Sequence, residues 1–176
     1  MSQAPPWRVL AERVVVQDRF VDLRAERVVT ETGHVLDPYW VMHLKDWVVI
    51  FAITPDQQVV LVRQWRQGVK QWVLEPPGGV IDAGEPVAAA LRELREETGY
   101  TAQAARHLGA MFTDPARNTN RLHVVLAAGA VLAGPPEREA SEAMAVELLP
   151  LAALRPALFG CGLHMAAAGM ALAAQP

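Results

Sequence analysis

The sequence predicts a mixed α/β protein: a mixed β-sheet between helices over residues 46–176, with an antiparallel, strand-rich extension over residues 1–45. Three observations support this fold class. Runs of β-branched and aromatic residues dominate the first half of the chain, as is typical of strands. The apolar spacing then changes to a helical period between Pro86 and Gly99. Strand-like runs and a last helical segment follow, which favours helices layered on a central sheet.

The extension contains three runs with strand character, at Arg13–Val16, Phe20–Val29 and Tyr39–Leu44. Turn-forming residues separate them, at Thr32-Gly33-His34 and at Asp37-Pro38. We therefore expect short strands joined by tight turns.

Two nearly continuous apolar runs come next, at Trp47–Ile53 and Val59–Val62, joined by the turn sequence Thr54–Gln57. Because their apolar residues do not alternate with polar ones, both faces of each strand should be buried. These runs are expected to form the centre of a sheet that helices cover on both sides.

A helix is predicted between Pro86 and Gly99, since proline suits the first helical turn and glycine the residue after the last one. Its apolar face comprises Val87, Ala90, Leu91 and Leu94. Strands are expected afterwards at residues 108–112, 122–127 and 144–149, then helical segments within 150–174. A polar loop at 133–142 precedes the last strand.

Composition excludes several classes of function. The 176 residues are 52% hydrophobic and 20% charged, with a net charge of -3 and no basic run. Nonspecific binding to nucleic acid needs clustered lysine and arginine, so we expect no nucleic-acid partner. The single cysteine, Cys161, permits no internal disulfide and is consistent with a reducing compartment.

The stretch from Pro156 to Pro176 has no formal charge and nearly the length of a membrane span. It consists mostly of alanine and glycine, which favour membrane insertion much less than leucine or phenylalanine do. A packed C-terminal helix is therefore favoured over a tail anchor, and no membrane partner is expected. The first residues lack an apolar run after a positive cluster, so we expect a cytoplasmic protein.

Three glutamates crowd one side of the predicted helix. Glu93, Glu96 and Glu97 fall at i, i+3 and i+4, where like charges repel. Magnesium prefers such carboxylates and shares its shell with substrate phosphates, which suggests metal-assisted attack of water on phosphorus. Arg92 and Arg95 offer the alternative, a solvated face of ordinary ion pairs. The glycine-rich segment before the helix decides in favour of the metal site, because it lets the backbone approach closely.

The whole segment resembles the Nudix box, G-x5-E-x7-R-E-U-x-E-E-x-G-U. Its fixed positions match Gly79, Glu85, Arg92, Glu93, Leu94, Glu96, Glu97, Gly99 and Tyr100. One departure is that six residues, not seven, separate Glu85 from Arg92. The deletion leaves the register from Arg92 to Gly99 intact, so the metal face should survive, while the loop that carries Glu85 is one residue shorter than in the motif.

The resemblance implies roles for these residues in a Nudix fold. Glu93 and Glu97 would be the principal ligands of Mg²⁺, for which Mn²⁺ can substitute, and Glu96 would ligate or tune a second ion in catalysis. Arg92 would orient the glutamates through a charge-assisted hydrogen bond. The carbonyl of Gly78 would be a backbone ligand.

Features outside the box are similar to the ADP-ribose pyrophosphatase and nucleotide-sugar branch of the family. They are the run Leu61–Arg66 and the entry Glu75-Pro76-Pro77-Gly78-Gly79. This resemblance implies substrate binding by Arg63, Arg66 and Glu75, although the arginines could equally be solvated charges. Trp40 or Trp47 would stack on the base, with a place in the core as the alternative for each. The extension would build a homodimer and contribute to the ligand site.

Two further assignments rest on position alone. Glu142, with Glu139 second, would serve as metal ligand or general base from the loop before the last strand, or would be a solvated acid. Asn120 could read a sugar or phosphate, or shape a turn. The expected reaction is metal-dependent hydrolysis of ADP-ribose or a related nucleoside diphosphate sugar. Alternatives are hydrolysis of nucleoside triphosphates or dinucleoside polyphosphates, and a non-catalytic nucleotide sensor.

Overall fold

The computed structural model describes residues 6–137 and 143–175. The chain divides into two compact units. One contains the residues up to Lys45 together with Phe112–Asn120, and the other contains Asp46–Met111 and the residues from Arg121 onward.

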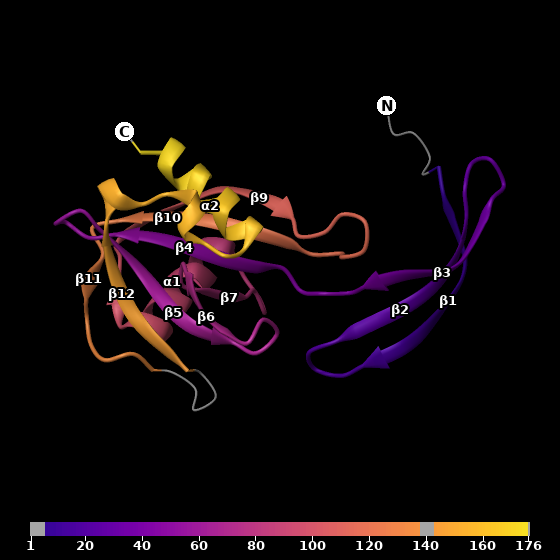
Figure 1. Cartoon of the computed structure of the whole chain (residues 1–176), viewed down its shortest axis with the longest axis horizontal. Coiled ribbons are helices and arrows are strands. Elements are labelled where there is room, and N and C mark those ends of the chain that lie inside the picture. The colour runs from indigo at the N-terminus through magenta and orange to yellow at the C-terminus, as the bar shows by residue number, and fades with distance from the viewer. Residues whose placement is uncertain (1–5, 138–142, 176) are drawn as a thin grey trace. The chain divides into compact units, whose positions relative to one another are not determined.

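The first unit is built on a three-stranded antiparallel sheet in the order β1-β2-β3 (Figure 1). Its strands are β1 (Arg8–Gln17), β2 (Asp22–Val29) and β3 (Val35–Met42). The three predicted strands of the extension are thus confirmed, with somewhat different bounds.

The predicted turn at Asp37-Pro38 is wrong, because both residues lie inside β3. Proline is tolerated there since β3 is an edge strand, where a missing N–H breaks no central ladder. The pairing of β2 with β3 also shifts register between Glu26 and Val28, so the ladder is irregular at the proline.

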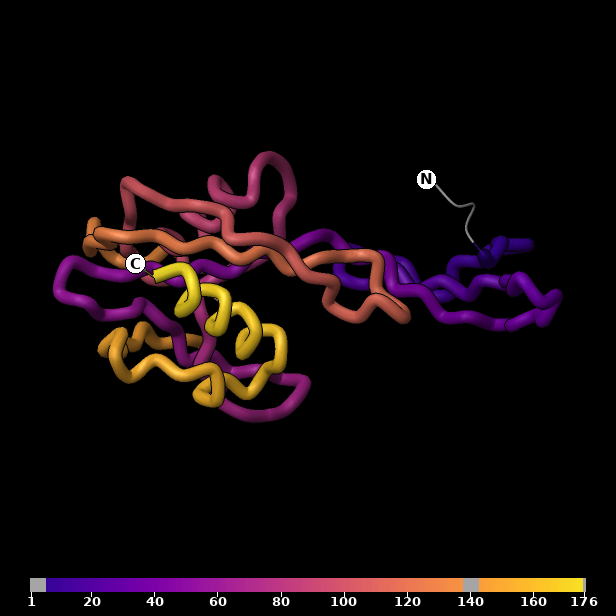
Figure 2. Tube along the Cα trace, turned by 90° about the horizontal axis from the view of Figure 1, so that it is seen from above, coloured from indigo at the N-terminus to yellow at the C-terminus, as the bar shows by residue number. Residues whose placement is uncertain are grey.

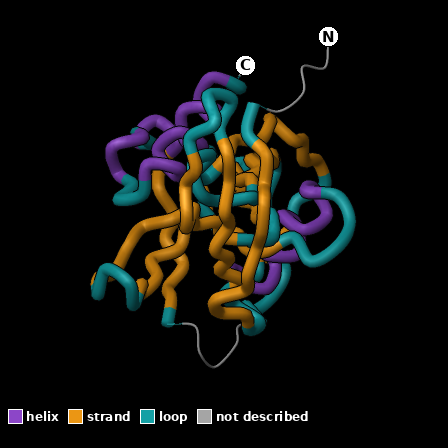
Figure 3. The backbone as a smooth tube through the Cα atoms, turned by 90° about the vertical axis from the view of Figure 1, so that its right-hand side faces the viewer, coloured by secondary structure: helices purple, strands orange, loops and turns teal. Residues whose placement is uncertain are grey.

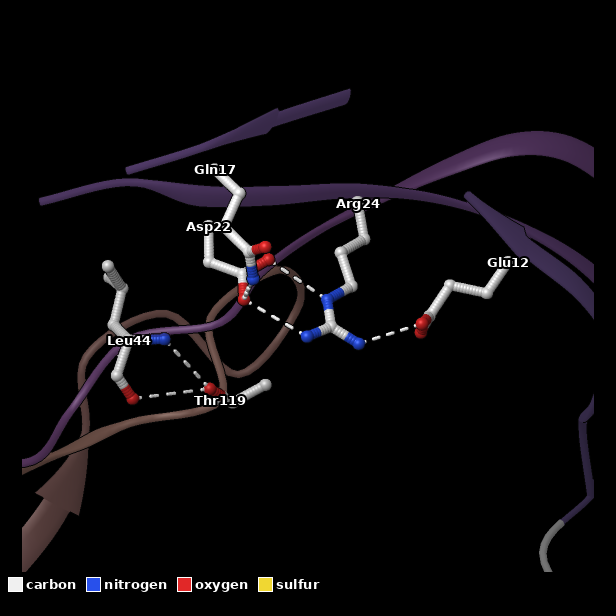
Figure 4. A network of polar contacts seen from close by, with 6 residues as sticks. All are labelled: Glu12, Gln17, Asp22, Arg24, Leu44 and Thr119. Carbon is white, nitrogen blue, oxygen red and sulfur yellow. Dashed lines mark hydrogen bonds and ion pairs between the residues drawn. The ribbon is translucent and has the colours of Figure 1, made fainter. Parts of the chain in front are cut away.

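Polar contacts fasten the segment Phe112–Asn120 to the end of β3 and the residues after it. The backbone N–H of Met42 donates to the carbonyl of Arg117 at 2.8 Å. Thr119 Oγ1 accepts a hydrogen bond of 3.1 Å from the N–H of Leu44. Figure 4 shows this contact. The same figure shows Arg24, which binds Asp22 and Glu12 and so links β2 to β1.

The second unit contains a seven-stranded mixed sheet. Its main path is β12-β5-β4-β10-β9, with β6 paired to β5 and β7 paired to β4. β4 runs parallel to β10 and antiparallel to β5. The strands are β4 (Trp47–Ile53), β5 (Gln58–Arg66), β6 (Gln71–Glu75), β7 (Gly78–Val80), β9 (Ala104–Phe112), β10 (Arg121–Ala128) and β12 (Met144–Pro150). β8 (Tyr100–Thr101) and β11 (Val131–Leu132) form a separate pair.

Helices cover both faces of this sheet, as predicted (Figure 3). On one face α1 (Pro86–Thr98) packs Ala89, Ala90 and Leu94 against Val48 and Ile50 of β4. On the other face α2 (Gly162–Ala173) buries three alanines against the core; Figures 1 and 2 show it in yellow. The short 3-10 turns η1 (Leu151–Ala153) and η2 (Pro156–Leu158) precede α2.

The central strands confirm the expectation of burial on both faces. Every residue of β4 after Trp47 is buried, as are residues 59–62 of β5. No helix within the described part of the chain is long and apolar enough to cross a membrane.

Candidate active site

Helix α1 places the crowded glutamates. It begins at Pro86, directly after the N-cap Glu85, and ends at Gly99, whose φ of 76° gives the left-handed conformation of a helix terminus. The helix is unbroken between these residues, so the shorter turn before it leaves the spacing of the glutamates intact. Glu85 itself is exposed and makes no side-chain cap.

Two of the glutamates are directed at strand β7. Glu97 is only 6% exposed, and its Oε2 accepts a hydrogen bond of 3.0 Å from the N–H of Gly78. Glu93, with a side chain 13% exposed, lies against Gly79. A Cβ atom at Gly79 would overlap the carboxyl group of Glu93 and lie 2.7 Å from its Oε2, so glycine permits this approach.

On its other side, β7 lies equally close to its partner strand β4. Gly78 pairs with Val49 of β4. A Cβ at position 78 would overlap the backbone oxygen of Val48 and lie 3.0 Å from the Cα of Val49. The backbone at Gly78 is therefore wedged between β4 and the Glu97 carboxylate.

Arg92 connects the remaining carboxylates. Its guanidinium donates to Glu93 Oε1 at 2.7 Å, to Glu96 Oε2 at 2.6 Å and to the carbonyl of Val80 at 3.4 Å. Burial alone would lower the pKa of Arg92, but the neighbouring glutamates outweigh it and raise the pKa, so the guanidinium stays charged. Glu96 is the most exposed of the three acids, with 40% of its side chain accessible.

A cleft of about 750 Å³ begins at the glycine strand. β4 pairs with β7 at Trp47–Val49 and with β5 only at Ala52 and Ile53, so its two partner strands diverge and leave a gap between them. The lining residues come from β4, the β5–β6 hairpin, β7 and the start of α2: Trp47, Val49, Arg66, Gln67, Gly68, Val69, Gln71, Val73, Glu75, Pro76, Gly78, Gly79, Val80, Gly160, Cys161 and His164.

An ion pair in the cleft wall joins two of the predicted substrate-binding residues. Glu75 is 5% exposed, and its Oε2 accepts from Arg66 Nη2 at 2.6 Å and from Nε at 2.9 Å. Arg63 is three residues away and so points to the opposite face of β5, where it pairs with Glu147 of β12. It is absent from the cleft lining.

The other predicted substrate-binding residues belong to different units of the chain. Trp47 lines the cleft, while Trp40 lies on β3 of the first unit with 38% exposure. Asn120 is 5% exposed, and its amide nitrogen donates to the carbonyl of Lys45 at 3.0 Å. That contact holds together the two ends of the first unit.

Glu139 and Glu142 lie outside the described residues. The loop can be followed as far as Glu137, whose N–H donates to the carbonyl of Glu96 at 2.8 Å and whose carboxylate pairs with Arg95 at 3.2 Å. The described end of the loop is thus attached to α1.

His164, which is not among the predicted site residues, is 3% exposed and lines the cleft. The signal for it was present, because His164 is the only ionisable side chain besides Cys161 between Pro156 and Pro176. In the first unit, Glu12, Glu26 and His43 form a group of possible metal ligands, because their ligand atoms lie within 4.8 Å of one another. Arg24 already pairs with Glu12 at 2.7 Å, so part of that charge is balanced without an ion.

Comparison with known proteins places this geometry in a family. Residues 43–162, more than half of the chain, match the NUDIX domain. An ADP-ribose pyrophosphatase of Bacillus subtilis (strain 168) is 32% identical over 121 residues, covering 68% of this chain and 65% of the relative. An ADP-sugar pyrophosphatase of Mus musculus is 47% identical over 68 residues, covering 38% of this chain and 31% of that protein. The chain thus spans less than two thirds of either relative's length.

Among solved structures, a crystal structure of an ADP compounds hydrolase superposes with a TM-score of 0.80. The match covers 97% of this chain and 94% of that one at 22% identity, and it supports the fold alone. The family match, the fold and the helix-borne glutamates agree: the chain belongs to the Nudix family.

Proposed function

We propose that this Nudix protein hydrolyses the diphosphate linkage of ADP-ribose or a related nucleoside diphosphate sugar, giving a nucleoside monophosphate and a sugar phosphate. One observation carries the proposal. The carboxylates of Glu93 and Glu97 pack against a glycine strand that also lines the cleft. Two relatives named for pyrophosphatase activity on ADP-ribose and ADP-sugars support this substrate class.

The donor groups on α1 and β7 fit a divalent metal. Carboxylate and carbonyl oxygens are hard ligands, which Mg²⁺ prefers and Mn²⁺ accepts. Glu93, Glu97 and the carbonyl of Gly78 would hold the ion, with Glu96 tuning or sharing a second one. When bound, such ions polarise the phosphoryl oxygens and activate water.

The chain's own residues would orient the reactants. Arg92 holds Glu93 and Glu96 through charged hydrogen bonds, which fixes the metal face before substrate arrives. Arg66 carries a positive charge into the cleft and would bind a phosphate oxygen. Trp47 offers an aromatic face in the same cleft for a base or sugar. Glu142 or Glu139 remains our candidate for the general base.

We also propose a cytoplasmic homodimer formed through the N-terminal extension. All ten residues of β1 are exposed in the single chain, including Val9, Leu10, Val14 and Val16 at 46–57%. An edge strand with this much accessible apolar surface is a favourable site for pairing with a second copy.

A substrate panel tests the reaction. ADP-ribose, several nucleotide sugars, dinucleoside polyphosphates and nucleoside triphosphates are incubated with the protein and magnesium, and products are identified by ³¹P NMR. We expect ADP-ribose or a nucleotide sugar to be cut fastest, to a monophosphate and a sugar phosphate. Fastest turnover on triphosphates, or none on the panel, would contradict the proposal.

A variant links that activity to the site. Glu97→Gln keeps an oxygen that can accept from the Gly78 N–H, but it removes the negative charge. Turnover should fall at least about 100-fold, which exceeds the usual loss when a residue that only orients a metal ligand is replaced. Glu31→Gln, at an exposed turn residue of the first unit, is the matched control and should retain activity.

A further inference from the structure

The start of α2 brings an unused polar side chain into the cleft. His164 is 3% exposed and lies in the cleft wall. Neither of its ring nitrogens has a hydrogen-bond partner among residues 6–137 and 143–175. Buried nitrogens without partners are unfavourable, so an imidazole kept in this position calls for a polar group to meet it.

The surroundings of His164 indicate which kind of polar group would meet its imidazole. Its Nδ1 lies 3.8 Å from Oε1 of Glu75, whose other oxygen is held by Arg66. The indole of Trp47 meets the ring edge-on, with centroids 5.7 Å apart. Burial lowers the pKa of His164; Glu75 opposes this effect and Arg66 adds to it, so the ring is neutral near pH 7. A neutral imidazole offers one donor and one acceptor, and the carboxylate beside it offers acceptors.

The position of this pair along the cleft indicates the part of the substrate it meets. Glu75 precedes Gly78 by three residues, and Gly78 belongs to the proposed metal-binding end. Arg66, the proposed phosphate contact, is bonded directly to Glu75. A group that reaches Glu75 and His164 is therefore next to the diphosphate, and in a nucleotide sugar that group is a sugar.

We propose that His164 and Glu75 form a subsite that binds neighbouring hydroxyl groups of a sugar attached to the diphosphate. A hydroxyl can donate to the carboxylate or to the unprotonated imidazole nitrogen, and it can accept from the imidazole N–H. The donors and acceptors therefore match. This inference rests on the proposed function. The sugar can be the ribose of the nucleoside or the terminal sugar, and the hydroxyl chemistry is common to both.

The test compares substrates that lack one hydroxyl. ADP-ribose, its analogue deoxygenated at C2 of the nucleoside ribose and its analogue deoxygenated at C2 of the terminal ribose are measured with the wild-type protein and with His164→Phe. Phenylalanine keeps the ring packing against Trp47 and Phe159 but removes both nitrogens. His164→Gln restores a donor and an acceptor, and Met165→Leu is the control on an exposed neighbour.

We expect the wild-type kcat/KM to fall about tenfold for one of the two analogues, as for the loss of one hydrogen bond. In His164→Phe the ratio of kcat/KM for ADP-ribose to kcat/KM for that analogue should fall to near one, mainly because KM for ADP-ribose rises. His164→Gln should recover part of the wild-type ratio. The analogue that shows the effect identifies the sugar. The same ratio in His164→Phe and wild type, with both variants folded by circular dichroism, would overturn the subsite and leave the hydrolase proposal standing.

A binding measurement separates the two proposals if no nucleotide sugar is cut. Ribose 5-phosphate is titrated by calorimetry into wild type and His164→Phe. Weaker binding by the variant, about tenfold in Kd, would support the subsite although the hydrolase proposal had failed. Equal binding or none would overturn the subsite as well.

Discussion

Gly79 sets how closely the Glu93 carboxylate approaches strand β7. A methyl group there would overlap the end of a flexible glutamate side chain, which can swing away at little cost. A methyl group at Gly78 would instead overlap the backbone oxygen of Val48, which belongs to a buried central strand. The missing side chain thus serves different purposes at these neighbouring glycines: at Gly79 it makes room for Glu93, and at Gly78 it lets β7 pair closely with β4.

Alanine substitutions separate these purposes. Gly79→Ala should leave the free energy of unfolding within about 0.5 kcal/mol of wild type, yet lower magnesium-dependent activity about 10–100-fold by displacing Glu93. Gly78→Ala should reduce the free energy of unfolding by about 1–3 kcal/mol, because β7 must move off β4. Urea unfolding measures the free energy of unfolding of each variant, and a magnesium titration measures its activity. Equal stability losses in the two variants would show that this distinction is wrong.

The buried imidazole of His164 predicts a pH dependence of stability. Its pKa is lowered in the folded state, mainly by burial, so the unfolded chain binds the proton more readily. The stabilisation is complete above the ordinary value of 6.5 and is lost as the pH falls from there toward the lowered folded pKa. His164→Phe removes this contribution. Between pH 7.5 and 5.5 the wild type should therefore lose more free energy of unfolding than His164→Phe, and parallel curves would refute the effect.

At the scale of elements, α2 docks through small residues. Ala167, Ala168 and Ala171 are at most 1% exposed in the core that also contains Phe51 and Leu61. With such short side chains the helix backbone can approach the sheet closely, and there is no space to enlarge them. The contacts also hold His164 at the cleft wall.

A matched pair of substitutions checks this docking. Ala168→Leu adds volume at a fully buried position and should cost about 1–3 kcal/mol of unfolding free energy. Ala166→Leu makes the same change on the exposed side of the helix and should be nearly neutral. Chemical denaturation monitored by tryptophan fluorescence compares them, and similar losses in both would mean that α2 is not packed as described.

The elements differ in how far the sequence could predict them. Helix α1 was predictable because its apolar period, Pro86 and Gly99 agree. β7 was not, since Gly78 and Gly79 disfavour strands and only pairing with β4 makes this segment extended. The glutamates of the proposed metal site lie on one helix and could be named in advance. The pair of Glu75 and His164 depends on the docking of α2, 89 residues further along the chain, which no local pattern encodes.

At the scale of the whole molecule, the two compact units have different kinds of surface. The second unit has a two-sided core and encloses the cleft and the glutamates. The first unit is built on one three-stranded sheet, and among its described residues only Ala25 and Val28 are buried hydrophobic ones. A sheet with so little burial gains stability if a second copy covers it, which is the physical argument for the dimer.

A charge in β1 tests that argument. Val14→Asp would place a carboxylate in the proposed interface and should raise the dissociation constant of the dimer at least about tenfold. Phe20→Asp, at a 70% exposed position in the turn after β1, is the control and should leave the dimer intact. Light scattering over a concentration series gives the dissociation constant of the dimer for the wild type and for each variant. A wild-type monomer at high concentration would contradict the homodimer outright.

A crystal structure with Mn²⁺ and a methylene analogue of ADP-ribose, recorded at the manganese absorption edge, tests the proposed metal site most directly. We expect anomalous peaks bonded to the carboxylates of Glu93 and Glu97 and to the carbonyl of Gly78, with the diphosphate against them in the cleft. Carboxylates that contact only Arg92, the Gly78 N–H and solvent, with manganese bound elsewhere, would contradict the proposed site.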